Sequence, residues 1–146
     1  MSASARPLVA AAALGLMAAL ASCGGEQSAE EYRAELDGAC AEVAEQIEGI
    51  PQRAKEEDLT AEEGRRITDD VADEFASTVE DLDPPPELAD SHDRLVDKIR
   101  SEGPQGEIEE VREYTRSFGP IYDALGAREC SRRQQEALDG LEGAGP

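Results

Sequence analysis

The stretch Ser28–Ile50, SAEEYRAELDGACAEVAEQIEGI, decides the fold of this chain. Its apolar side chains recur at steps of three or four residues, namely Tyr32, Leu36, Cys40, Val43, Ile47 and Ile50. This spacing places them along one face of an α-helix. Ser28 is followed three residues later by Glu31, which is the pattern of a capping box. We therefore predict a helix that begins just after Ser28 and stops at Pro51.

Three further helices are predicted downstream of this stretch. Thr60 and Glu63 form a second capping box, and apolar residues at helical spacing follow it up to Pro84. A third helix follows the three consecutive prolines at 84–86, because a proline suits the first turn of a helix. A fourth stripe runs from residue 108 to 125, and Gly119-Pro120 must kink or split it because proline has no N–H to donate.

These helices and their short connections indicate the fold class. No segment shows the alternating pattern of a strand. We predict an all-α fold, a small antiparallel four-helix bundle over residues 29–130, with a signal helix before it and a disulfide as a staple. Residues 131–146 are expected to form a C-terminal tail, because a helix over 131–141 would be short and Gly140, Gly143 and Gly145 loosen its end.

The N-terminus has the pattern of an export signal. Residues 1–6 carry one positive side chain, Arg6, and residues 8–20 follow without a charge. This apolar run is shorter than the roughly 20 residues that a helix needs to cross a membrane. We therefore expect a signal peptide over residues 1–22.

The end of this segment carries a more specific pattern. Leu20-Ala21-Ser22-Cys23 resembles the bacterial lipobox, in which a leucine and two small residues precede an obligatory cysteine. The resemblance implies that diacylglycerol is attached to the Cys23 thiol and that the chain is cleaved just before it. The alternative is an ordinary signal peptide with Ala19 and Ala21 as the small residues before the cut. On the first reading, residues 23–28 are the lipidated cysteine and a short flexible linker.

The cysteine count fits this interpretation. The chain has three cysteines, and lipidation of Cys23 leaves the even pair Cys40 and Cys130. Export delivers the pair to an oxidising compartment, where a disulfide is the expected state. A metal-binding or catalytic thiol is the competing interpretation, but neither cysteine has a second cysteine or a histidine at ligand spacing.

The expected disulfide sets a geometric condition on the bundle. An antiparallel bundle brings the end of its fourth helix near the start of the first, but Cys40 lies about 17 Å along the first helix at 1.5 Å per residue. Either the first helix protrudes beyond its neighbours, or Gly126 turns the chain back along the bundle.

The net charge excludes some classes of function. It is −20 for the whole chain and becomes −21 when Arg6 leaves with the signal peptide. Such a surface repels phosphate backbones, so we expect no nucleic-acid partner. It also offers no polybasic patch for lipid head groups.

Two segments of the mature chain carry a broader resemblance. Leu82-Asp83-Pro84-Pro85-Pro86-Glu87-Leu88, continuing through His92, and the later Leu125-Gly126-Ala127-Arg128-Glu129-Cys130 resemble the small helical lipoproteins of actinobacteria. The resemblance covers roughly residues 32–130, and its motifs are structural. It implies placement at the cell envelope and no particular chemistry.

The search for reactive groups gives no catalytic set, no metal site and no cofactor motif. His92 is the only histidine, and it lies in register with Leu88 and Leu95, which favours packing or a hydrogen bond to a carboxylate. Ser91-His92-Asp93 are helix neighbours that point in different directions and do not make a triad. Two stripes are also better explained structurally. These are the acidic group Asp69, Asp70, Asp73 and Glu74, interpreted as a solvated helix face, and the aromatic group Tyr114, Phe118 and Tyr122, interpreted as core.

The sequence therefore predicts an exported lipoprotein that is not an enzyme. We expect it to be anchored by the lipid on Cys23 to the outer face of the cytoplasmic membrane and to act as a binding or structural module for another cell-envelope component. The alternatives are an acidic module that binds divalent cations and a secreted enzyme.

Overall fold

The computed structural model describes residues 27–104 and 107–143. The predicted signal peptide and Cys23 lie outside these residues. Within the described residues the secondary structure is all α-helix, which confirms the predicted class. The helices are α1 (Ala29–Glu56), α2 (Ala61–Glu80), α3 (Ala89–Arg100), α4 (Ile108–Arg116), α5 (Gly119–Leu125) and α6 (Arg128–Gly143).

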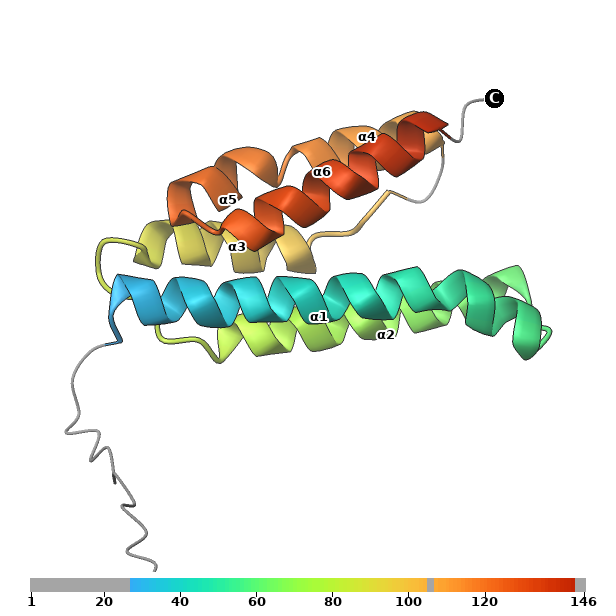
Figure 1. Cartoon of the computed structure of the whole chain (residues 1–146), viewed down its shortest axis with the longest axis horizontal. Helices are drawn as coiled ribbons and strands as arrows, with labels where there is room; N and C mark the ends of the chain where they lie inside the picture. Colours follow the sequence, from blue (N-terminus) through green and yellow to red (C-terminus); the bar gives the residue numbers. More distant parts are fainter. Residues whose placement is uncertain (1–26, 105–106, 144–146) are drawn as a thin grey trace, which may run out of the picture.

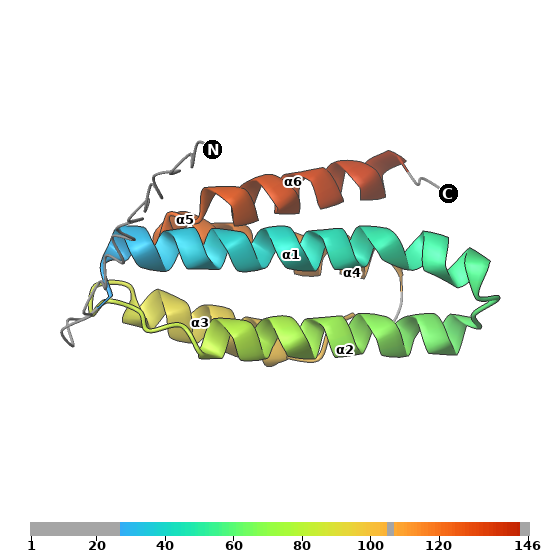
Figure 2. The ribbon, with the colours of Figure 1, turned by 60° about the horizontal axis from the view of Figure 1, so that its bottom comes forward.

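The helices form two layers (Figure 1). The long helices α1 and α2 make an antiparallel pair on one side, and α3, α4, α5 and α6 cover it on the other. The chain runs forward in α1 and α3 and back in α2 and in the pair α4 and α5, and α6 then runs parallel to α1. In Figure 2, α1 lies between α2 and α6, and it packs against both.

Both predicted capping boxes are present and fix the starts of the two long helices. The Ser28 hydroxyl accepts a hydrogen bond from the backbone N–H of Glu31, whose carboxylate accepts one from the Ser28 backbone N–H. Thr60 and Glu63 make the same reciprocal pair at the start of α2. Each box satisfies two backbone donors that a helix start otherwise leaves unpaired.

The prediction that the first helix ends at Pro51 is wrong. The helix α1 continues through Pro51 to Glu56. Side-chain hydrogen bonds one turn apart support this last segment, from Gln52 to Glu56 and from Arg53 to Glu57. Asp58 then adopts a left-handed conformation with φ 52° and ends the helical run.

The predicted break at Gly119-Pro120 is confirmed. The chain divides there into α4 and α5, with Pro120 in the first turn of α5. The Gln134 side chain of α6 donates a hydrogen bond to the backbone carbonyl of Thr115, beside the break. This contact fixes α6 against the end of α4.

The prediction of a C-terminal tail is wrong for residues 131–143, which belong to α6. Gly126 is left-handed, with φ 71°, and turns the chain so that α6 runs back along α1. The Asp37 carboxylate of α1 accepts hydrogen bonds from the backbone N–H groups of Glu129 and Cys130, which caps the start of α6. Because α6 gains this cap and packs on α1, tertiary contacts stabilise a helix that is marginal alone.

The predicted disulfide is confirmed, and its geometric condition is met by the turn at Gly126. Cys40 of α1 and Cys130 of α6 are bonded, with their Cα atoms 5.1 Å apart. The expected four-helix bundle is correct only in part. Four antiparallel rods are present, with α4 and α5 as one broken rod, but α6 adds a fifth alongside α1.

The hydrophobic core fills only the end of the bundle where α1 begins. Its fully buried large side chains include Tyr32 and Leu36 of α1, Val79 of α2, Leu95 of α3 and Leu125 of α5. Farther along α1, the apolar stripe changes character: Val43 is half-buried and Ile47 is 48% exposed. The other end of the bundle is therefore not closed by the core.

Candidate functional site: an apolar cavity at the open end of the bundle

A cavity of about 480 Å³ occupies the part of the bundle that the core does not fill. This volume lies within the range of roughly 300–1,000 Å³ that is typical of small-molecule sites. Every helix contributes to its wall. The lining residues are Cys40, Val43, Ala44, Ile47, Glu48, Thr68, Ala72, Phe75, Ile99, Tyr114, Thr115, Phe118, Tyr122, Cys130, Arg133, Gln134, Glu136 and Ala137.

The closed end of the cavity is rigid. The disulfide between Cys40 and Cys130 and the buried side chain of Tyr122 form this floor. Burial raises the pKa of Tyr122, so its hydroxyl stays uncharged. The floor is therefore uncharged and cross-linked between two helices.

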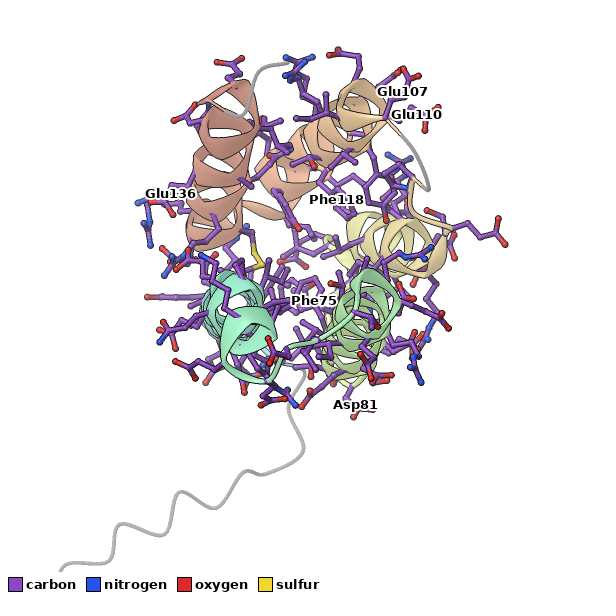
Figure 3. All side chains as sticks on the ribbon, turned by 90° about the vertical axis from the view of Figure 1, so that its right-hand side faces the viewer. Phe75, Asp81, Glu107, Glu110, Phe118 and Glu136 are labelled. Atoms are coloured by element: carbon purple, nitrogen blue, oxygen red, sulfur yellow. A yellow bond between two sulfur atoms is a disulfide. The ribbon has the colours of Figure 1, made fainter. Side chains whose placement is uncertain are left out.

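The open end lies where α1 and α2 extend past the core. Exposed residues from three helices lie at this mouth, namely Ile47 of α1, Thr68 and Ala72 of α2, and Ala137 of α6. Figure 3 looks into the bundle from this side and shows Phe75 and Phe118 between the helices, while Asp81 and Glu107 lie at the periphery. The wall is thus largely aromatic and aliphatic, and three charged side chains, Glu48, Arg133 and Glu136, also belong to the lining.

One ion-pair cluster stands beside the mouth and joins α1 to α6. Arg133 is mostly buried, with 23% of its side chain exposed, and its guanidinium lies 3.3 Å from Glu48 and 3.0 Å from Glu129. The same guanidinium lies 3.5 Å from Glu136. Arg132 also pairs with Glu129 and Glu136, so two guanidinium groups serve three carboxylates and the cluster keeps one net negative charge.

The interpretation of the aromatic stripe as core is correct for Tyr122 and in part for Phe118, which packs against the core, but it is wrong for Tyr114. Tyr122 is buried, but Tyr114 and Phe118 are half-buried and line the cavity. The rings of Tyr114 and Phe118 meet edge to face with centroids 5.2 Å apart, and Phe118 stacks on Tyr122 with centroids 5.8 Å apart. Lys98 of α3 lies over the Tyr114 ring, 4.5 Å from its centroid. The stripe makes one continuous aromatic wall.

His92 lies in the core and away from the cavity. It is 6% exposed, and its Nδ1 shares a hydrogen bond of 2.9 Å with the hydroxyl of Tyr32. The packing expected from the sequence is therefore found, but the hydrogen-bond partner is a tyrosine and not a carboxylate. Burial raises the pKa of Tyr32 to about 12, so the hydroxyl keeps its proton.

The stability of the fold should depend on pH through His92. Burial lowers the pKa of this imidazole, against the opposing effect of the Asp93 and Glu80 charges. The unfolded chain therefore binds the proton at a higher pH than the folded chain does. This contribution to stability is complete above about pH 6.5 and is lost as the pH falls toward the folded-state pKa, with a slope of at most about 1.4 kcal/mol per pH unit.

Urea unfolding of the protein and of His92→Gln should reveal this dependence. The measurement belongs between about pH 5 and pH 7, above the ordinary range of carboxyl groups. We expect the decline in stability in this interval to be smaller in the variant. Equal slopes in the two proteins would contradict the assignment to His92.

The acidic stripe of α2 lies on the surface. Asp69, Asp70, Asp73 and Glu74 are all exposed, and Asp73 lies 3.9 Å from a guanidinium nitrogen of Arg100. Among residues 27–104 and 107–143, no group of three or more histidine, cysteine or acidic side chains is arranged to hold a metal ion. No helix in this part of the chain is both long enough and apolar enough to cross a membrane.

The cavity as a site was not predicted from the sequence. The sequence indicates Ile47 only as a position in an apolar stripe, and Ala137 lies in the segment expected to be a tail. One feature of the sequence points toward the cavity. The apolar stripes of the first two predicted helices are longer than the stripe of the third. A long helix pair covered by shorter helices leaves part of its apolar face without a partner.

Comparison of the chain with protein-family models, with curated proteins and with solved structures finds no match. The functional proposal therefore depends on the residues of the chain itself.

Proposed function

We propose that this chain is an exported lipoprotein, anchored through Cys23 to the outer face of the cytoplasmic membrane, whose helical domain binds an apolar component of the cell envelope. The cavity of about 480 Å³ is the observation that carries the binding role. A packed protein core seldom contains a void larger than a water molecule, so an apolar cavity of this size in the bundle favours a binding site.

The disulfide and the N-terminal pattern support the proposed location. A disulfide between Cys40 and Cys130 suits an oxidising compartment outside the cytoplasm. Two or more acyl chains on Cys23 would hold the domain firmly, since each buried CH₂ contributes about 0.8 kcal/mol. Ser28, the N-cap of α1, comes only five residues after Cys23 in the sequence, so the domain would stand close to the lipid surface.

The anchor is tested by replacing Cys23 with alanine. The native protein should partition into a detergent phase, and its mature N-terminal peptide should begin at an acylated Cys23 by intact-mass analysis. Cys23→Ala should remain as uncleaved precursor or appear in the soluble fraction. An unmodified N-terminal peptide in the native protein would refute the lipoprotein assignment.

The binding role is tested with an apolar dye whose fluorescence rises in a dry site. We expect the mature chain, carrying Cys23→Ser so that no acyl chain competes, to bind one dye molecule saturably. Ala44→Phe places a ring in the half-buried wall of the cavity and should abolish binding. Ala124→Phe, at an exposed position of α5 that does not line the cavity, is the matched control and should bind normally. Absence of saturable binding by the parent chain would refute the role.

A further inference from the structure

The cavity has the size and the walls for a chain of carbon atoms. Its volume of about 480 Å³ is roughly three times the volume of about 150 Å³ that takes up one benzene molecule. Val43, Ile47, Phe75 and Phe118 give the wall apolar surface. A flexible alkyl chain fits such a space, because it gains the full benefit of leaving water and needs no polar partner there.

The charged residues at the mouth of the cavity favour one charge on the head group of a bound ligand. Of the residues that line the cavity, Glu48 and Glu136 are acidic and Arg133 is the basic one. Arg133 is already within 3.3 Å of Glu48 and 3.0 Å of Glu129, so its charge is compensated. Glu48 is 67% exposed at its side chain and is accessible to a ligand group. Glu48, Glu129 and Glu136 outnumber Arg132 and Arg133 by one charge, so a cationic head group would be attracted to this place and an anionic one repelled.

The whole molecule reinforces this local preference. The net charge of the chain is −20, so its potential draws cations toward the surface and repels anions. The mouth also lies far from the anchored end. Ile47 comes 18 residues after Ala29, the first residue of α1, which is about 27 Å along a helix. The cavity therefore opens away from the N-terminal end of the bundle.

We propose that the cavity binds a single-chain amphiphile with a cationic head group, its alkyl chain lying between α1, α2, α4 and α6 and its head beside Glu48. This inference rests on the proposed binding function and adds the chemical class of the ligand. The open end admits the chain, and the disulfide floor limits its depth.

Calorimetry with three dodecyl compounds that differ only in the head group tests the ligand class. The probes are dodecyltrimethylammonium, dodecyl maltoside and tridecanoate, which is a dodecyl chain on a carboxylate, each below its micelle concentration, with the mature Cys23→Ser chain. We expect one binding site and an affinity for the cation at least about fivefold above that for the anion, with the uncharged compound between them. Added salt should reduce this difference.

Two pairs of variants separate the cavity from general attraction to an acidic surface. Glu48→Lys should remove most of the preference for the cation. Glu87→Lys makes the same change of charge at an exposed position before α3, outside the cavity lining, and should keep the preference. Ala44→Phe should abolish binding of all three compounds, and Ala124→Phe should not. Thermal unfolding of each variant verifies that it is folded.

The outcomes distinguish the two proposals. Equal or tighter binding of tridecanoate, or a preference unchanged in Glu48→Lys, would overturn the cationic ligand class while dye binding still supported the apolar site. Binding of the cation at many sites, insensitive to Ala44→Phe, would also overturn it. Absence of saturable binding by the dye and by all three compounds would refute the binding function as well.

Discussion

Replacing Cys40 or Cys130 by serine is expected to lower the free energy of unfolding by about 4–5 kcal/mol. The disulfide joins residues separated by 90 positions, so it removes a large part of the conformational freedom of the unfolded chain. This loss is comparable to the whole stability of a typical small domain. Each serine variant should therefore be partly unfolded at room temperature, or close to it.

Urea unfolding of the mature chain in a Cys23→Ser background measures this loss without interference from the third cysteine. Cys40→Ser and Cys130→Ser should lower stability by similar amounts, and the double variant should add little, because each single change already removes the whole bond. Reduction of the unchanged protein should reproduce the effect. Two fully reactive thiols in the unfolded, unreduced protein would show that the bond is absent in solution.

The disulfide was predictable because it follows from cysteine count and compartment alone. The starts of α1 and α2 were predictable for a similar reason: Ser28 with Glu31, and Thr60 with Glu63, satisfy their backbone donors locally. The break before α5 also has a local cause, since Pro120 lacks an N–H wherever it occurs. Features with a local cause are visible in the sequence.

The error at Pro51 has a local cause, and the other two errors concern features that depend on tertiary contacts. Pro51 has the same chemistry as Pro120, but good helix formers and side-chain bonds follow it, and α1 continues. The sequence does not predict the helix α6, because it does not show that Asp37 of α1 caps the start of α6. The cavity depends on how far each helix extends beside its neighbours, which periodicity does not specify.

The bundle has one end that holds the core and one end that holds the cavity. Truncating an apolar side chain to alanine should lower stability more at the core end than at the cavity end. Leu95 is fully buried among core residues of several helices. Leu95→Ala should lower the free energy of unfolding by about 3 kcal/mol, since it removes apolar contacts and leaves a void. Ile47 is 48% exposed at the mouth of the cavity, and Ile47→Ala should cost less than about 1 kcal/mol.

Urea unfolding of the two variants and their parent makes this comparison quantitative. The dependence of the free energy of unfolding on urea concentration should be the same in all three, so that a shift of the midpoint reports stability alone. The Ile47 variant is also informative about function, because a side chain kept half exposed contributes little to folding yet lines the proposed site. We expect Ile47→Ala to weaken binding of the dodecyl cation by about fourfold, which corresponds to the loss of roughly one CH₂ of buried contact. A cost of Ile47→Ala close to that of Leu95→Ala would mean that the helices close over the cavity in solution and that the core extends along the whole bundle.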